Sequence, residues 1–323
     1  MRVVVRDRFG LPGVLRLEEV EPPVVGERDV LVRVRATSVN PLDWHLLTGV
    51  PYVARIEAGW RRPKSRRVGT DFAGVVAEVG AAVTAFTPGD EVFGARPGSF
   101  AEYQLVPEDR AIVSKPGNVT FEQAAAVPVA AVTALQALRE KGRVERDMRV
   151  LVNGASGGVG TFAIQIAKAD GAQVTAVCST RNVEQAQALG ADRVVDYTRE
   201  DFTRAGERYD VIVDNAGSHP WRDYRRVLNR DGRLVVVGGP KGGRALGSLS
   251  RLARLKAASI VGYGTVVPLL ATLNKPRLLA LRELLERGAV RPVVERTYAL
   301  DEIAEALRYV GTGHARGKVV LTV

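Results

Sequence analysis

The stretch VLVNGASGGVG, from Val150 to Gly160, decides the fold class of this chain. Three apolar residues are followed by a turn with four glycines, and Thr161–Ala169 then shows the apolar spacing of a helix. This order is typical of a strand, turn and helix that bind a dinucleotide, because the glycines let a pyrophosphate approach the N–H groups at the helix start. Ala155 replaces one glycine of the usual pattern, so the flanking strand and helix carry the assignment. The expected cofactor contacts in this turn are Ser156, Gly157, Gly158 and Val159.

The next predicted strand, Gln173–Cys178, indicates which dinucleotide is bound. An NAD-binding unit carries an acid about 20 residues beyond the glycines, where it holds the ribose 2′-hydroxyl. Here the strand is followed by Ser179, Thr180 and Arg181, with no acid. Hydroxyls and a guanidinium suit a 2′-phosphate, so the sequence favours NADPH over NADH as the cofactor. Ser179 and Thr180 are also good helix N-cap residues, and this structural role remains an alternative.

Composition narrows the class of protein. The chain has 323 residues, 46% of them hydrophobic, which is enough for two domains with sizeable cores. It has one cysteine, no apolar run of transmembrane length and no signal-peptide pattern at its start, so we expect a cytoplasmic protein. The formal net charge of +10 is spread along the chain, apart from one dense run at residues 61–67. Without an RNA-binding aromatic pattern, this run indicates a solvated loop or a rim that attracts an anionic cofactor rather than nucleic acid.

The pattern along the chain divides it into a β-rich part and an alternating part. Up to about residue 120, Pro and Gly separate short predicted strands. These strands are at residues 2–5, 14–19, 30–38, 74–79, 91–93 and 101–106. A buried, alanine-rich helix is predicted over residues 121–141, with a break or kink at Pro128.

From Met148 onward, predicted strands alternate with helices, which indicates a doubly wound parallel sheet. The strands are at residues 149–152, 173–178, 193–196, 211–215, 234–238 and 259–263, and the helices at 183–189, 221–228 and 276–287. A final helix (301–310) and strand (318–323) return to β character and are expected to rejoin the first domain. We therefore predict a catalytic domain of residues 1–121 plus 291–323, and a cofactor domain of residues 122–290.

Seven segments resemble the medium-chain dehydrogenase/reductase superfamily in its zinc-free branch around quinone oxidoreductase and zeta-crystallin. They are SVNPLDW (38–44), GTDFAGVV (69–76), FTPGDEVFG (86–94), AAAVPVAAVTAL (124–135), NGASGGVG (153–160), LGADRVVDY (189–197) and GHARGKVVL (313–321). The resemblance covers the whole chain. It implies an α/β protein with a GroES-like β-barrel catalytic domain and a Rossmann-fold cofactor domain, with the active site in a cleft between them. Dimers are common among the resembling proteins, so a homodimer is one expected state.

The resemblance also implies chemistry without a metal. Asn40, Thr70 and Asp71 stand where zinc-dependent relatives carry metal ligands, and the four-cysteine structural zinc lobe is missing. One cysteine and three scattered histidines do not make a tetrahedral zinc site. Hydride addition to a quinone or an α,β-unsaturated carbonyl places negative charge on an oxygen that hydrogen-bond donors can stabilise. The leading expectation is an NADPH-dependent quinone or enone reductase. A zinc-free alcohol or carbonyl dehydrogenase and a non-catalytic, crystallin-like NADPH-binding protein are the alternatives.

The segment after the third predicted strand supplies the candidate catalytic residues. Asn40 is a candidate to bond the nicotinamide ribose or the substrate, although it also suits a turn before Pro41. His45 and Tyr52 are candidate donors to the developing oxyanion, and each has the alternative of an ordinary packed or surface residue. Asp43 is expected to support the loop by accepting backbone N–H bonds.

Three further residues are assigned to the cofactor. By resemblance, Tyr197 lies near the adenosine 2′-phosphate, although it also suits packing on the next helix. Lys318, in the last of the quoted segments, is expected to touch the cofactor phosphates or simply to start the final strand. Gly238, which ends the predicted strand at 234–238, completes the set. Beyond the cofactor and a possible second copy of the chain, the expected partner is a small-molecule substrate.

Overall fold

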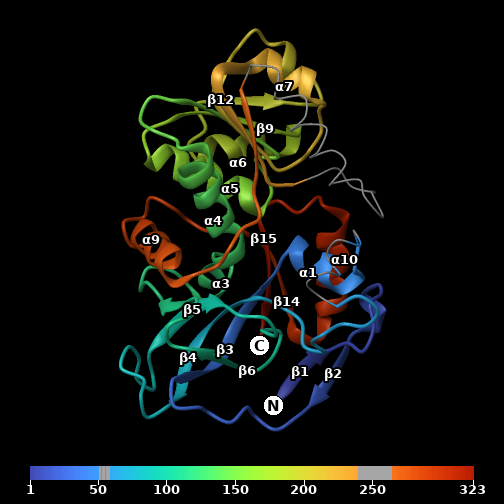
Figure 1. The fold of residues 1–323 in the computed structure, drawn as a ribbon, viewed down its shortest axis with the longest axis vertical. Helices are drawn as coiled ribbons and strands as arrows, with labels where there is room; N and C mark the ends of the chain where they lie inside the picture. The colour runs from blue at the N-terminus through green and yellow to red at the C-terminus, as the bar shows by residue number, and fades with distance from the viewer. Residues whose placement is uncertain (51, 53–54, 56–58, 239–263) are drawn as a thin grey trace. The chain divides into compact units, whose positions relative to one another are not determined.

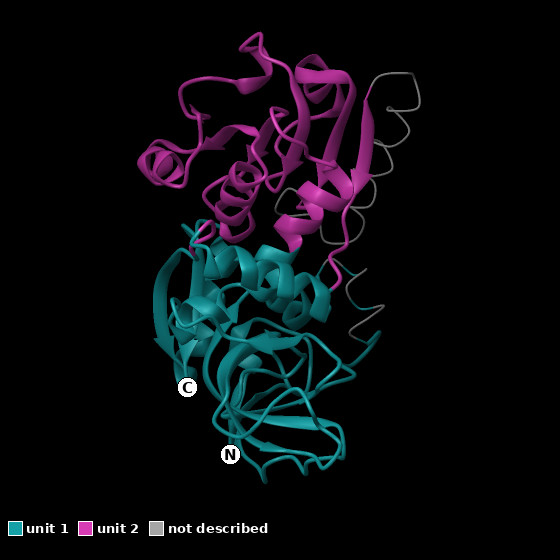
Figure 2. Ribbon diagram, turned by 90° about the vertical axis from the view of Figure 1, so that its left-hand side faces the viewer, with its two compact units in different colours: residues 1–132, 273–288, 292–323 teal, residues 133–272, 289–291 magenta. Residues whose placement is uncertain are grey.

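The computed structural model describes residues 1–50, 52, 55, 59–238 and 264–323, with the elements labelled in Figure 1. The chain forms two compact units, which Figure 2 colours separately. Unit 1 comprises residues 1–132, 273–288 and 292–323, and unit 2 comprises residues 133–272 and 289–291. The strand expected at residues 259–263 lies outside the described residues. None of the helices in the described ranges is both long and apolar enough to cross a membrane.

Unit 1 is built on an antiparallel sheet. Its described strands follow the order β14-β15-β3-β4-β5-β7, β6 also pairs with β3, and only the β14–β15 pair is parallel. The strands are β1 (Arg2–Val5), β2 (Arg16–Glu19), β3 (Asp29–Val39), β4 (Asp71–Val79), β5 (Glu91–Ala95), β6 (Tyr103–Pro107), β7 (Ile112–Ser114), β14 (Val294–Ala299) and β15 (Lys318–Thr322). The helices are η1 (Pro12–Val14), α1 (Pro41–Thr48), α3 (Phe121–Ala125), α4 (Pro128–Leu135, beginning in unit 1), α9 (Lys275–Glu286), η5 (Leu300–Glu302) and α10 (Ile303–Thr312).

The core of unit 1 follows from alternation along β3. Val30, Val32 and Val34 point to one face of the strand, as the two-residue period requires, and pack with Phe72 and Ile112. The C-terminal strand β15 pairs antiparallel with the end of β3. This pairing brings the last residues of the chain into the first unit.

Unit 2 contains a parallel sheet with the described order β10-β9-β8-β11-β12-β13. The strands are β8 (Arg149–Asn153), β9 (Gln173–Cys178), β10 (Arg193–Asp196), β11 (Tyr209–Asp214), β12 (Leu228–Val236) and β13 (Thr265–Pro268). The helical segments are η2 (Gln136–Gly142), α5 (Gly158–Ala169), η3 (Thr180–Asn182), α6 (Val183–Ala188), η4 (Phe202–Arg204) and α7 (Trp221–Val227). The strand order reverses between β8 and β11, and open α/β sheets bind ligands at such a switch point.

Most of the predicted elements are confirmed, including the doubly wound sheet and the helix break at Pro128. The elements that were not predicted are helix α1, the strands β7, β13 and β14, and the short helices η1, η3 and η4. The boundaries of the two compact units also differ from those of the two predicted domains. Helix α9, expected in the cofactor domain, is part of unit 1, where the Lys275 ammonium donates to the carbonyl of Glu108 and the Asn118 amide donates to the carbonyl of Leu285.

Candidate active site and cofactor site

Helix α1 begins at the segment that the sequence marked as catalytic. Asn40 is its N-cap residue and Pro41 follows at the first helical position, where the missing N–H is not needed. The Asp43 carboxylate accepts from the Asn40 backbone N–H at 2.8 Å and from the Thr70 hydroxyl at 3.1 Å. Asp43 therefore supports the start of the helix, as predicted. Asn40 is only 1% exposed, so its amide must find partners inside unit 1.

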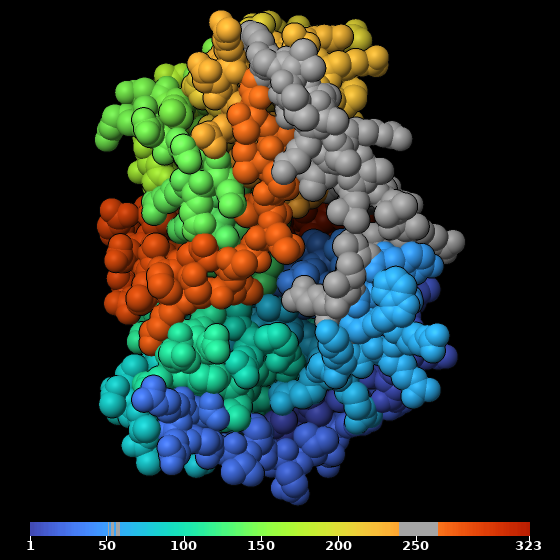
Figure 3. All heavy atoms as spheres, viewed as in Figure 1, coloured from blue at the N-terminus to red at the C-terminus, as the bar shows by residue number. Residues whose placement is uncertain are grey.

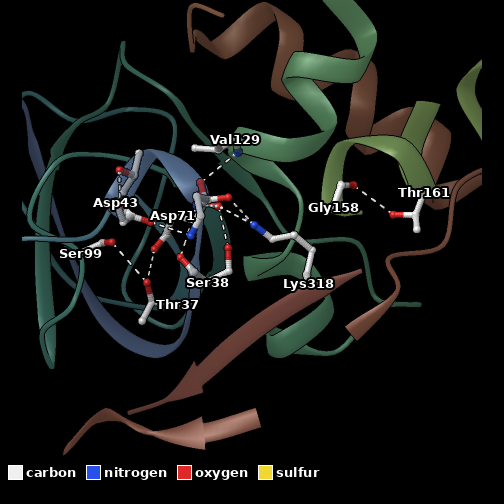
Figure 4. Close-up of polar contacts among 11 residues, drawn as sticks. Thr37, Ser38, Asp43, Asp71, Ser99, Val129, Gly158, Thr161 and Lys318 are labelled. Atoms are coloured by element: carbon white, nitrogen blue, oxygen red, sulfur yellow. Dashed lines mark hydrogen bonds and ion pairs between the residues drawn. The ribbon is translucent and has the colours of Figure 1, made fainter. Parts of the chain in front are cut away.

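Asp71, at the start of β4, is the centre of a buried polar network (Figure 4). One carboxylate oxygen accepts from the Ser38 hydroxyl at 2.7 Å and from the Asn40 amide nitrogen at 2.9 Å. The other accepts from the Val129 backbone N–H at 3.0 Å. The Lys318 ammonium lies 3.7 Å from Asp71 and donates to the Asn40 amide oxygen. This network, here called the Asp71–Lys318 cluster, joins β3, α1, β4, α4 and β15.

Burial sets the electrostatics of the Asp71–Lys318 cluster. Desolvation, together with the nearby Asp71 carboxylate, raises the pKa of Asp43 to about 7. Desolvation likewise raises the pKa of Asp71 and lowers that of Lys318, while the mutual attraction of the two groups opposes both shifts. The Lys318 ammonium attracts both buried carboxylates, which favours their charged forms.

The donor set at the metal-ligand positions does not fit a zinc ion. Zinc prefers thiolate, imidazole and carboxylate ligands in a tetrahedron. Asn40, Thr70 and Asp71 offer an amide, a hydroxyl and one carboxylate, and the first and last already bind the ammonium of Lys318. Within the described ranges, no group of three or more His, Cys, Asp or Glu side chains is arranged to hold a metal.

The surroundings of the two predicted proton donors, His45 and Tyr52, affect their ability to donate a proton differently. His45 is exposed near the end of α1, and its Nδ1 lies 2.7 Å from the Val50 carbonyl oxygen. A neutral imidazole that donates there keeps only a lone pair on Nε2, so it cannot donate a second proton. Tyr52 is 45% exposed, and the Arg55 guanidinium lies 4.9 Å from its ring centre. The neutral hydroxyl of Tyr52 can donate a proton, whereas His45 would first have to gain a second proton on its imidazole.

In unit 2 the glycine turn has the geometry that its sequence predicts. Gly154 has a φ of +78°, a left-handed conformation that favours glycine. A Cβ at Gly160 would lie 2.3 Å from the Gly154 carbonyl oxygen, so only glycine lets α5 pack on the turn. Gly157 is the N-cap residue of α5. Gly158, labelled in Figure 4, begins the helix. The predicted contacts at residues 156–159 thus surround a helix start whose N–H groups can donate hydrogen bonds to an anion.

Two of the predicted 2′-phosphate residues, Thr180 and Arg181, line a hollow of about 620 Å³. Asp196, Arg199 and other side chains also line it. Tyr197 is 61% exposed and follows Asp196 directly. Ser179 makes no side-chain cap hydrogen bond to the following turn, and its hydroxyl accepts from the Asn182 amide nitrogen at 3.0 Å. The structure therefore does not support the capping role for Ser179.

Asp196 is an acid that the sequence analysis missed in this hollow. No acid follows β9 directly in the sequence, but the parallel pairing of β10 with β9 sets Asp196 opposite Cys178. Its carboxylate accepts from the Thr180 hydroxyl at 2.6 Å and from the Thr198 hydroxyl at 2.8 Å. The Arg199 guanidinium lies 3.5 Å away. The signal for such a residue is the strand-pairing register, which a single sequence does not show.

Two other predicted cofactor residues have defined surroundings. Lys318 is bound within the Asp71–Lys318 cluster of unit 1, because a buried ammonium needs a carboxylate partner. Its contact with a cofactor phosphate remains a prediction. Gly238 donates its N–H to the Asp214 carbonyl at 3.1 Å, and a Cβ there would lie only 2.1 Å from the Asn215 carbonyl oxygen. Gly238 is needed for close packing at the end of β12.

The basic run at residues 61–67 lies on the surface of unit 1, in light blue in Figure 3. Arg66 is not a free cation, since it pairs with Asp7 at 2.7 Å and with Glu18 at 2.8 Å. Arg67 is partly buried and donates to the carbonyls of Gly98 and Tyr103. Part of the run is therefore used within the fold, which weakens the case for a nucleic-acid surface.

Comparison with known proteins agrees with both units. Residues 26–117 match the family described as "Alcohol dehydrogenase GroES-like domain", and residues 189–321 match "Zinc-binding dehydrogenase". The mitochondrial NAD(P)H oxidoreductase RTN4IP1 of Mus musculus is 35% identical over 98% of this chain and 88% of its own. The 2-methylene-furan-3-one reductase of Solanum lycopersicum is 34% identical, over 97% and 76%. The structure of the quinone oxidoreductase from Coxiella burnetii superposes with a TM-score of 0.86 at 32% identity, covering 100% of this chain and 99% of that one.

A parallel sheet with a glycine turn, and a GroES-like unit beside it in the sequence, define an oxidoreductase that uses a nicotinamide dinucleotide. Within that class, the chain belongs to the medium-chain dehydrogenase/reductase family, in the branch of the quinone oxidoreductases. The match to "Zinc-binding dehydrogenase" does not include Asn40, Thr70 or Asp71, so it does not bear on the donor set described above.

Proposed function

We propose that the protein is an NADPH-dependent reductase that transfers hydride to a quinone or an α,β-unsaturated carbonyl without a metal. The observation that carries the proposal is the Asp71–Lys318 cluster, in which an ammonium lies among residues at the metal-ligand positions. Without a Lewis acid, reduction of an isolated ketone lacks its main electrostatic help. A conjugated acceptor spreads the developing charge, so hydrogen-bond donors are sufficient.

The residues of this chain would bind and orient the cofactor and would protonate the reduced substrate. The cofactor would supply the hydride from its nicotinamide ring. The N-terminal end of α5 would hold the pyrophosphate, and Arg181 with Tyr197 would hold the 2′-phosphate. Tyr52 would donate its hydroxyl proton to the oxyanion of the substrate. Asn40 would act differently from the sequence prediction, because its amide is already bound to Lys318 and Asp71. We propose that Asn40 positions α1 instead of touching the substrate.

The proposed function is tested by NADPH oxidation against a panel of quinones, alkenals and saturated ketones, with metal content measured on the same preparation. Quinones or alkenals are expected to be reduced and saturated ketones to be left almost untouched. Activity is expected to survive a strong chelator, because the Asp71–Lys318 cluster carries its own cation. Stoichiometric zinc that leaves together with activity would contradict the metal-free mechanism, and faster reduction of ketones would favour a carbonyl dehydrogenase.

Tyr52→Phe is expected to slow the chemical step. A donor to an oxyanion binds the transition state more strongly than the ground state, so its loss lowers kcat more than it changes KM. Loss of one such donor costs roughly 10²–10³ in kcat, and a delocalised enolate places this case at or below the lower end. The measurement is kcat and KM with an accepted quinone or enone, together with Tm and the NADPH dissociation constant, both expected to stay unchanged.

Tyr103→Phe is the matched control, since Tyr103 is a partly buried tyrosine on β6 outside the proposed site. It is expected to leave kcat unchanged. If Tyr52→Phe reduces every substrate at the wild-type rate, Tyr52 only lines the site. The proton then comes from solvent or from protonated His45, and a pH-rate profile of His45→Gln separates these two sources.

The substrate class, the cellular location and the oligomeric state are further parts of this proposal. A quinone or enone substrate is a small molecule, in agreement with the names of the relatives. A cytoplasmic location, expected from the single cysteine, stays a prediction, because one of these relatives is named as mitochondrial. The homodimer expected from the resemblance also stays a prediction.

A further inference from the structure

Asn215, directly after β11, has a buried amide without a hydrogen-bond partner. Both its amide nitrogen and its amide oxygen are inaccessible to solvent, and neither bonds to any described residue. Most buried side-chain polar atoms are paired, because an unpaired one costs the free energy of its lost hydration. The residue as a whole is partly exposed, so the amide lies just below the surface of unit 2.

The position of Asn215 places this amide beside the glycine turn. Strand β11 lies between β8 and β12 in the sheet, next to the point where the strand order reverses. The backbone N–H of Asn215 donates to the Asn153 carbonyl at 3.0 Å. A Cβ at Gly154 would lie 3.3 Å from the Asn215 Cβ, so the side chain also borders the turn. Gly238 packs closely against the Asn215 carbonyl.

The neighbouring Asn153, at the end of β8, is an asparagine whose side chain has a structural role. Its amide nitrogen lies 2.9 Å from the Asp214 carboxylate, 3.1 Å from the Ser218 hydroxyl and 3.3 Å from the Tyr224 hydroxyl. Asn153 thus joins β8 to β11 and α7 through its side chain. The Asn215 side chain makes no comparable hydrogen bonds in the described structure.

We infer that the Asn215 amide binds the vicinal hydroxyls of the nicotinamide ribose; this rests on the proposed use of a nicotinamide dinucleotide. An amide has both a donor and an acceptor, whereas phosphate oxygens only accept and would leave the amide oxygen unpaired. Two adjacent hydroxyls satisfy both groups, one by accepting from the nitrogen and one by donating to the oxygen. In NADPH the adenosine 2′-hydroxyl is phosphorylated, so the nicotinamide ribose carries the one intact diol.

The test compares Asn215→Ala with wild type for NADPH, NADH and adenosine 2′,5′-bisphosphate, which lacks the nicotinamide ribose. Two lost hydrogen bonds are expected to weaken NADPH and NADH binding alike, by roughly 5- to 30-fold. Bisphosphate binding is expected to stay unchanged. The Tm of the ligand-free protein is expected to stay the same or rise, because the variant removes an unpaired buried amide. Asn215→Ser, too short to bridge both hydroxyls, is expected to show most of the same loss and guards against a folding defect in the first variant.

Asn153→Ala is the control, expected to lower the Tm of the ligand-free protein because it breaks a formed network. If Asn215→Ala lowers that Tm in the same way and keeps wild-type cofactor affinity, the amide is structural and the inference is wrong. Weakened bisphosphate binding would place the amide at the adenosine end and would equally overturn it. If wild-type protein binds no nicotinamide dinucleotide, the proposed function itself fails, and the inference fails with it.

Discussion

Lys318→Met is expected to lower the free energy of unfolding at pH 7 by about 3–5 kcal/mol, the usual cost of removing one partner of a buried ion pair. Methionine keeps much of the side-chain volume but leaves the Asp71 carboxylate, which is 0% exposed, without its cation. The Asn40 amide oxygen also loses its donor. Urea denaturation of both proteins at the same pH measures the difference.

Two further variants separate charge from packing at this position. Lys168→Met removes a more exposed ammonium, 2.8 Å from Asp192, and is expected to cost under about 1 kcal/mol. The double variant Lys318→Met/Asp71→Asn is expected to recover part of the loss, because the unpaired buried charge is gone. A Lys318→Met protein of wild-type stability that binds NADPH weakly would instead support the original prediction of a phosphate contact.

Arg181→Ala is expected to weaken NADPH binding on the order of 10- to 100-fold and to leave NADH binding nearly unchanged. Loss of a hydrogen bond to a charged group costs about 1.5–3 kcal/mol, and each 1.4 kcal/mol is a factor of ten in affinity. Arg181 is exposed and lines the hollow beside Thr180, where a 2′-phosphate is proposed to bind. Calorimetric titration with both cofactors is the measurement.

Arg204→Ala is a control for the loss of a surface guanidinium, since Arg204 is 78% exposed and lies 3.5 Å from Asp201. It is expected to leave both affinities unchanged. Asp196→Asn tests the competing possibility that Asp196 holds the ribose 2′-hydroxyl of NADH. If that variant loses NADH affinity while Arg181→Ala loses neither cofactor, the preference for NADPH is wrong.

Local patterns in the sequence were sufficient for much of the fold. The strands at residues 2–5, 173–178 and 193–196 were predicted with their observed bounds, since a period of two or a short apolar run between turn residues is a strong local signal. The break at Pro128 follows from the missing N–H of proline. Helix α1 was missed, although Asn40 and Pro41 together form a recognisable N-terminal signal.

What the chain's sequence determines by itself is therefore the pair of folds, the glycine turn and the residue types at the metal-ligand positions. The tertiary structure alone decided that Lys318 meets Asp71 and Asn40, residues more than 240 positions earlier in the chain. It also decided that Asp196 reaches Thr180 and that the Asn215 amide lacks a partner. The physical reason is that periodicity and turn chemistry act between near neighbours. Ion pairing, strand register and the satisfaction of buried polar atoms depend on which distant segments pack together.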